Sequence, residues 1–135
     1  MEVIAHYVGG VKFEVAARGH RVICDQPLDN GGGDEGMAPP EFLLASLATC
    51  GGYYAAQYLK ARGLSTEGLQ VRVTAEKALK PARLAAFRLE VSANVDERHQ
   101  EGLHRAVKTC LVHNTLLSPP EIDIRIMPSS VPAHC

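Results

Sequence analysis

The sequence of residues 1–135 predicts one domain with an α+β fold, in the order βββ-α-ββ-α-β, with mostly antiparallel strands around a central buried helix. Three observations predict this class. Several short segments alternate apolar with polar residues, which is the period of a strand with one buried face. Glycine or proline turns separate consecutive segments of this kind. Two longer segments have a helical pattern and helix signals at their ends.

Three strands are predicted before residue 25. Residues 2–8 alternate, the Gly9-Gly10 pair interrupts them, and residues 11–17 resume the alternation, as in a hairpin. A second turn at residues 18–20 leads into a third strand. Residues 25–40 hold three prolines and four glycines and show no apolar period, so they predict a long loop.

Residues 41–63 predict the central helix. Pro39 and Pro40 suit its first turn, Glu41 places a negative charge near its N-terminus, and Gly63 supplies the C-terminal stop. Apolar residues cover much of its circumference, which indicates a buried helix rather than a surface one.

The second half of the chain predicts two more strands, a helix and a last strand. The strands cover residues 69–77 and 83–95, with a turn at Lys80-Pro81. Asp96 is expected to cap a helix that continues to the prolines at 119 and 120. Residues 121–127, EIDIRIM, alternate again and predict a strand that closes the domain.

Composition argues against several classes of partner. A net charge of -1 gives no electrostatic reason to expect nucleic acid or an anionic membrane surface. The N-terminal residues lack the basic start and apolar core of a signal peptide, and no apolar run reaches the ~20 residues of a membrane helix. We therefore expect a cytoplasmic protein that binds neither nucleic acid nor membrane.

Four cysteines, at positions 24, 50, 110 and 135, lie far apart without a Cys-x-x-Cys pair. This is neither a zinc-ribbon spacing nor a secreted disulfide framework. Buried cysteines are often inert core residues, so that interpretation stays open for each of them. Zinc bound by Cys50, Cys110 and His113 is conceivable by ligand type, but only the last two lie close in sequence.

Two segments, APPEFLLASLATC at 38–50 and CLVHNTL at 110–116, resemble the cysteine motifs of the OsmC/Ohr family of thiol-dependent hydroperoxide reductases. The resemblance covers essentially the whole chain. Leu111 stands where the family usually has proline, and His113 where it often has serine.

The resemblance implies a cytoplasmic enzyme of the oxidative stress response that reduces organic hydroperoxides. Cys50 would be the peroxidatic cysteine and Cys110 the resolving one, and the resulting disulfide would be reopened by an external thiol such as a dihydrolipoyl group. The family also implies an intertwined homodimer with its sites at the subunit interface, and no metal, haem or flavin cofactor. Cys24 and Cys135 have no predicted catalytic role.

A buried thiol needs a compensating charge, because burial among leucines raises its pKa. The family uses an N-terminal arginine held by the glutamate at the helix start, which implies Arg18 and Glu41. Cys50 lies nine positions after Glu41, so the two lie on opposite faces of a regular helix, ~13 Å apart along the axis. Either the arginine bridges them, or the first turn is irregular at Pro39-Pro40, or the glutamate acts on the partner subunit's site.

Alternatives to these assignments remain open. Arg18 also fits a plain turn residue, since a Gly-His turn resembles OsmC-like members without the arginine, and Glu41 also fits a helix N-terminal acid. His113 could tune Cys110 or simply bond a local carbonyl. The alternative function is a non-enzymatic protein of the same fold that binds a small molecule or senses redox state.

Overall fold

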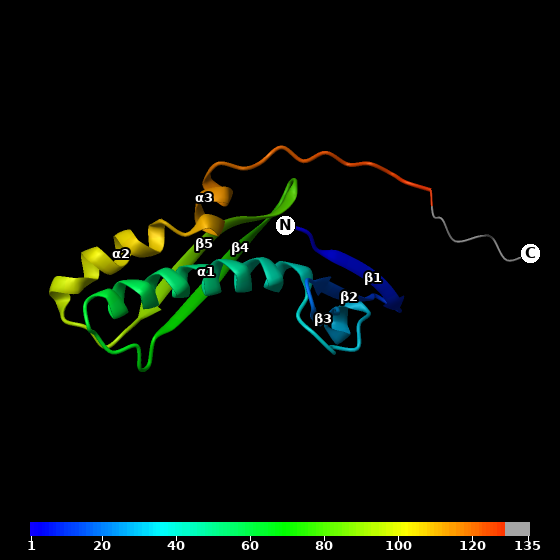
Figure 1. Cartoon of the computed structure of the whole chain (residues 1–135). Helices are drawn as coiled ribbons and strands as arrows, with labels where there is room; N and C mark the ends of the chain where they lie inside the picture. The colour runs from blue at the N-terminus through cyan, green and yellow to red at the C-terminus, as the bar shows by residue number, and fades with distance from the viewer. Residues whose placement is uncertain (129–135) are drawn as a thin grey trace, which may run out of the picture.

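The computed structural model describes residues 1–128 and has two separate antiparallel sheets and three α-helices (Figure 1). This confirms the predicted α+β class. The elements in chain order are β1 (Ile4–Gly9), β2 (Lys12–Ala17), β3 (His20–Cys24), α1 (Pro39–Ala61), β4 (Gln70–Leu79), β5 (Ala82–Ser92), α2 (Gln100–Lys108) and α3 (Leu111–Leu117). Single 3-10 turns, η1 (Leu28–Asn30) and η2 (Glu97–His99), precede α1 and α2.

The first sheet has the order β1-β2-β3, as the alternation predicts. Gly9 and Gly10 form the first turn with φ of 113° and 58°, in the region that favours glycine. Arg18 takes a left-handed φ of 57° in the second turn. The sheet lies beyond the start of α1, away from the β4–β5 hairpin (Figure 1). Much of its apolar surface is therefore left open.

A buried carboxylate orders the loop between β3 and α1. Asp25 is fully buried, and its two oxygens accept hydrogen bonds from the backbone N–H of Gln26 at 2.8 Å, Gly33 at 3.1 Å and Glu35 at 3.0 Å. Lys12 on β2 pairs with the Glu35 side chain at 2.8 Å. The loop is thus held at both ends although its sequence has no apolar period.

Helix α1 is the central element, and both of its predicted ends are confirmed to within two residues. Gly63, with a φ of 66°, donates its N–H to the Lys60 carbonyl, which closes the C-terminal end. One side of the helix packs on the β4–β5 hairpin and the other contacts α2 and α3. The core cluster that joins these layers consists of Ala55, Leu59, Leu103 and Val107.

The β4–β5 hairpin runs from the pair Gln70 and Ser92 to the pair Leu79 and Ala82, with one register shift between Glu76 and Lys77. The tight turn at Lys80-Pro81 lies where the sequence predicts it. None of the helices within residues 1–128 has the length and apolarity that crossing a bilayer requires.

The predicted second helix is wrong in one respect, because two helices take its place. The chain leaves the helical conformation at Cys110, whose ψ is 128°, and restarts as α3. The Cys110 sulfur accepts a hydrogen bond from the backbone N–H of His113 at 3.4 Å, which caps the new helix. The Asp96 side chain caps nothing and pairs instead with Arg98 at 3.2 Å.

The predicted strand over residues 121–127 is also wrong for the single chain. This segment pairs with no other strand of the described residues, and it leads away from the fold (Figure 1). Ile122, Ile124 and Ile126 are 83%, 79% and 91% exposed. The alternation is that of a strand, but a strand needs a neighbouring backbone, and none lies beside it. Cys135 lies outside the described residues.

We predict that Asp25→Asn loosens the loop, because the new amide nitrogen would face the N–H groups of Gly33 and Glu35 as a second donor. Hydrogen exchange at these two amides should speed up by about ten-fold relative to the wild type. Asp29→Asn, an exposed change in the same loop, is the control and should leave both rates unchanged.

The effect of Asp25 should depend on pH. The N–H of Glu35 is the largest influence that lowers the pKa of Asp25; burial opposes it, and the N–H groups of Gln26 and Gly33 add to it. A lowered folded pKa means that the carboxylate stabilises the fold above its unfolded pKa of about 3.9, and that this is lost as the pH falls further. The difference in melting temperature between wild type and Asp25→Asn should shrink below about pH 4. A difference that stays constant from neutral to acid pH would contradict this role.

Candidate thiol site

The structure brings Cys50 and Cys110 together, although sixty residues separate them. Cys50 lies near the middle of α1, and Cys110 lies at the break between α2 and α3. The two thiols lie close enough for each to shift the pKa of the other. Both cysteines are free thiols; Cys110 is fully buried, whereas Cys50 is half-buried. A small molecule would therefore reach Cys50 first.

Helix α1 lies against its neighbours at the two glycines that follow Cys50. Gly51 is buried, and a Cβ atom at this position would lie 3.4 Å from Val107 of α2 and 3.6 Å from Leu89 of β5. A Cβ on Gly52 would lie 3.5 Å from Val71 of β4. These are ordinary van der Waals distances, so a methyl group would fit at either position. Just after Cys50, α1 therefore packs against both α2 and the hairpin.

The surroundings of Cys50 lower its pKa. Burial raises it, but hydrogen bonding from the Cys110 thiol and from the backbone N–H groups of Val112 and Leu111 together outweigh burial. These amides belong to the first turn of α3, where N–H groups lack partners within the helix. Neutral donors therefore stabilise the Cys50 thiolate.

The pKa of Cys110 shifts the other way. Burial raises it most, and donation of its thiol proton to Cys50 raises it further, while the N–H of His113 opposes the shift. The pair is thus asymmetric, because the more exposed Cys50 thiol loses its proton at lower pH than the buried Cys110 thiol. Such an arrangement gives one nucleophile and one neighbouring proton donor.

Arg18 and Glu41 do not join the thiols within the described chain. Arg18 is exposed at the turn between β2 and β3, and no arginine contributes to the lowered pKa of Cys50. Glu41 accepts a hydrogen bond from the N–H of Ala38 at 2.8 Å and so caps its own helix. Arg21, three residues after Arg18, pairs with Glu14. Among residues 1–128, no cation of this chain contributes to the pKa of Cys50.

The backbone amides of Leu111 and Val112, rather than an arginine, lower the pKa of Cys50, and the sequence did not predict this. Their signal in the sequence is weak. Cys110 precedes a short apolar stretch that carries no usual N-cap residue, so the helix restart was not visible.

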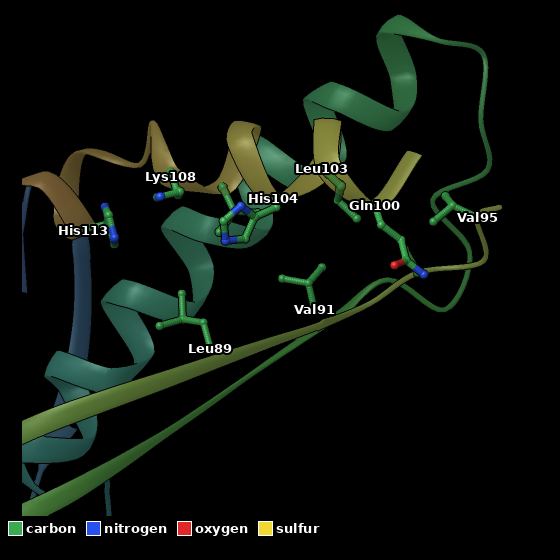
Figure 2. Close-up of a pocket in the computed structure, with 10 residues that line it drawn as sticks. Leu89, Val91, Val95, Gln100, Leu103, His104, Lys108 and His113 are labelled. Atoms are coloured by element: carbon green, nitrogen blue, oxygen red, sulfur yellow. The ribbon is translucent and has the colours of Figure 1, made fainter. Parts of the chain in front are cut away.

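His113 connects the thiols to a cavity. Its backbone N–H donates to Cys110, and its ring lines a cavity between β5 and α2 (Figure 2). The ring atom Nδ1 is buried and has no hydrogen-bond partner among residues 1–128. Cys24 lies apart, at the end of β3 beside Met37. Over the described part of the chain, no three His, Cys, Asp or Glu side chains form a group that could hold a metal ion.

We predict that Cys110→Ala lowers the reactivity of Cys50, because its sulfur loses a hydrogen-bond donor and its pKa rises. The alkylation rate of Cys50 by iodoacetamide at neutral pH should fall about three- to ten-fold, and its pH profile should move to higher pH. Mass spectrometry of the Cys50 peptide gives the rate. Cys24→Ala is the matched control and should change nothing, and an equal effect of both variants would contradict the assigned donor.

Comparison with known proteins supports this description of the fold. The family model described as OsmC-like protein matches residues 31–125. A protein from Psychrobacter arcticus 273-4, named for an osmotic stress induced and detoxification response, has a similar structure with a TM-score of 0.73 and 22% identity. The match covers 84% of this chain and 85% of that one.

Two further solved structures share the fold. An OsmC like protein from Mycoplasma pneumoniae has a TM-score of 0.71 and 20% identity, over 87% of each chain. An organic hydroperoxide resistance protein OsmC from Legionella pneumophila has a TM-score of 0.56 and 16% identity, over 86% of this chain and 89% of that one. The search of curated proteins found no match. Since the family model spans most of the sequence, the chain belongs to the OsmC-like protein family.

Proposed function

We propose that the protein is a thiol-dependent peroxidase that reduces organic hydroperoxides. The observation that carries the proposal is the asymmetric pair of thiols, in which the pKa of Cys50 is lowered and that of Cys110 is raised. Peroxide reduction needs a thiolate that a small molecule can reach and a second thiol within bonding distance. The Legionella pneumophila protein of the same fold is named for organic hydroperoxide resistance, which agrees with this proposal.

The first step is attack of the Cys50 thiolate on the terminal oxygen of the hydroperoxide. A sulfur–oxygen bond forms as the oxygen–oxygen bond breaks, and its electron pair leaves on the alkoxide, which takes a proton to become the alcohol. Cys50 is then a sulfenic acid. The sulfur has been oxidised by two electrons and the peroxide reduced by two.

The second step of the proposed cycle uses the thiol of Cys110. The Cys110 sulfur attacks the sulfenic sulfur, a disulfide forms, and the hydroxyl group leaves as water with the proton of the Cys110 thiol. An external dithiol, such as a dihydrolipoyl group, then reduces the disulfide and becomes oxidised itself. The cycle needs no metal, haem or flavin.

The working unit in this proposal is a homodimer. The face of the β1–β3 sheet that lies toward Pro39 and Phe42 lines an open, apolar hollow of about 580 Å³. The isoleucines of residues 121–127 are exposed as well. A second copy would cover both surfaces, and a sheet displaced from its own α1 is in a position to deliver Arg18 to the partner subunit's thiols. Arg18 then activates Cys50 in trans, with Glu41 as its expected holder.

A redox sensor is the second candidate, because the same thiol pair would form the same disulfide. The two functions differ in turnover. A sensor is oxidised once and stays oxidised until another protein reads or reduces it, whereas a peroxidase consumes many equivalents of peroxide when a dithiol is present. A purely structural role for both thiols predicts no disulfide at all.

We predict that the wild type consumes cumene hydroperoxide with dihydrolipoamide as reductant, and that Cys50→Ser lowers the rate at least about a thousand-fold. Cys110→Ser should still react once with peroxide but stop at the sulfenic acid, which dimedone traps as a mass increase on Cys50. Cys24→Ser is the control with normal turnover. Wild-type activity in Cys50→Ser would rule the mechanism out.

We also predict that the protein is a dimer in solution by light scattering, and that Val22→Glu, on the open apolar face of β3, yields monomers. Ile4→Glu on the other face of the same sheet should remain dimeric.

In the dimer, Arg18→Ala should lower the rate of peroxide consumption about ten-fold or more, and Arg21→Ala should change it little. Equal rates for both arginine variants would remove Arg18 from the site, and a monomeric, fully active wild type would contradict the dimer proposal.

A further inference from the structure

The cavity beside His113 has the features of a binding site that the thiol chemistry does not use. It has a volume of about 450 Å³, within the range of small-molecule sites. Neither Cys50 nor Cys110 lines it. Its floor is the face of β5 that carries Leu89, Val91 and Ala93, and its wall is the buried side of α2, with Leu103 and Val107. An apolar molecule would find a mostly hydrocarbon surface here.

The polar groups of the cavity come from one stripe of α2 and from α3. Gln100, His104 and Lys108 are four residues apart along α2 and so lie on one face of the helix. Figure 2 shows Lys108 and His113 toward one end of the cavity, Gln100 toward the other, and Leu89 and Val91 between them. The polar groups are therefore not spread evenly, and Lys108, the one permanent cation among the described residues that line the cavity, lies at the His113 end.

The charged group that lines the cavity is positive. Lys108 is a cation, and among residues 1–128 no aspartate or glutamate lines the cavity. Glu101, which follows Gln100 on α2, is exposed and paired with Arg105. Lys108 forms no ion pair with the described residues. An anion at this end would meet an unneutralised lysine.

The ring of His113 supplies the second, independent sign of a ligand. Its Nδ1 is buried, without a partner in the described chain, and the ring lines the cavity. Buried polar atoms are nearly always hydrogen-bonded, so an unpaired nitrogen in a ring that lines a cavity marks the place of a missing partner. An oxygen of a bound molecule would fill that place by accepting a hydrogen bond from the ring.

From these observations we propose that the cavity binds an apolar molecule that carries one carboxylate. The hydrocarbon part lies along Leu89 and Val91, and the carboxylate meets Lys108 and the His113 ring. A neutral alcohol would make the apolar contacts alone, and an apolar amine would place its charge against Lys108. The proposal does not depend on peroxidase activity, since a carboxylate needs no peroxide group in order to bind here.

The test is titration calorimetry of the full chain at pH 7 with three probes of equal chain length: octanoate, 1-octanol and octylammonium. Octanoate should bind about ten-fold more tightly than 1-octanol, and octylammonium should bind most weakly. Lys108→Met keeps the apolar stem of the side chain and should weaken octanoate about ten-fold without changing 1-octanol. Arg105→Met removes a cation of the same helix that does not line the cavity, and it should leave all three affinities unchanged.

Nitrogen NMR of the histidine rings locates the bound probe. Saturating octanoate should shift the His113 ring signals and leave those of His6, on β1, in place. Binding should persist in Cys50→Ser, whatever the fate of its peroxidase activity. Equal affinities for the three probes, equal effects of Lys108→Met and Arg105→Met, unmoved His113 signals, or no binding at millimolar octanoate would each overturn the proposal.

Discussion

The thiol site depends on one constraint, the interruption of the helix at Cys110 between α2 and α3. If α2 continued as a helix through residue 110, the backbone amides of residues 111 and 112 would bond to carbonyls of the preceding turn. The break releases these amides, which lower the pKa of Cys50, and it turns the Cys110 sulfur into the cap of α3. One backbone irregularity thus supplies the donors, positions the second thiol and makes the pair asymmetric.

This arrangement changes what a buried cysteine requires. A thiol among leucines was expected to need an arginine, because burial disfavours the charged form. In the structure, burial is indeed the largest influence on Cys50, yet uncharged donors outweigh it. An arginine from a second subunit would lower the pKa of Cys50 further, and it would also stabilise the alkoxide that leaves the peroxide. The proposed role of Arg18 is therefore to add to the effect of the neutral donors rather than to replace them.

The sequence was informative where a pattern is local. The hairpin turns at Gly9 and Lys80 and both ends of α1 could be predicted, because glycine, proline and strict alternation act on neighbouring residues. The thiol pairing could be anticipated only from the family resemblance, since no local pattern links residues 50 and 110. The restart at Leu111 could not be predicted, because its cap is a sulfur and its cause is packing against α1. The fully buried Asp25 was equally invisible, since an aspartate in a glycine-rich loop usually lies in solvent.

The prediction of a strand over residues 121–127 failed because this segment has no neighbouring strand among the described residues, although its sequence pattern is that of a strand. The alternation of isoleucine with charged residues is typical of a strand with one buried face, and only a neighbouring backbone is missing. The β1–β3 sheet has the opposite lack: its strands are paired, but no layer of the described chain covers its apolar face. Each surface would be costly to leave in water, and both occur in one chain that otherwise packs well around α1. In the proposed homodimer a second copy covers both surfaces and its Arg18 reaches Cys50, so the contacts that complete the fold would be the same ones that complete the thiol site.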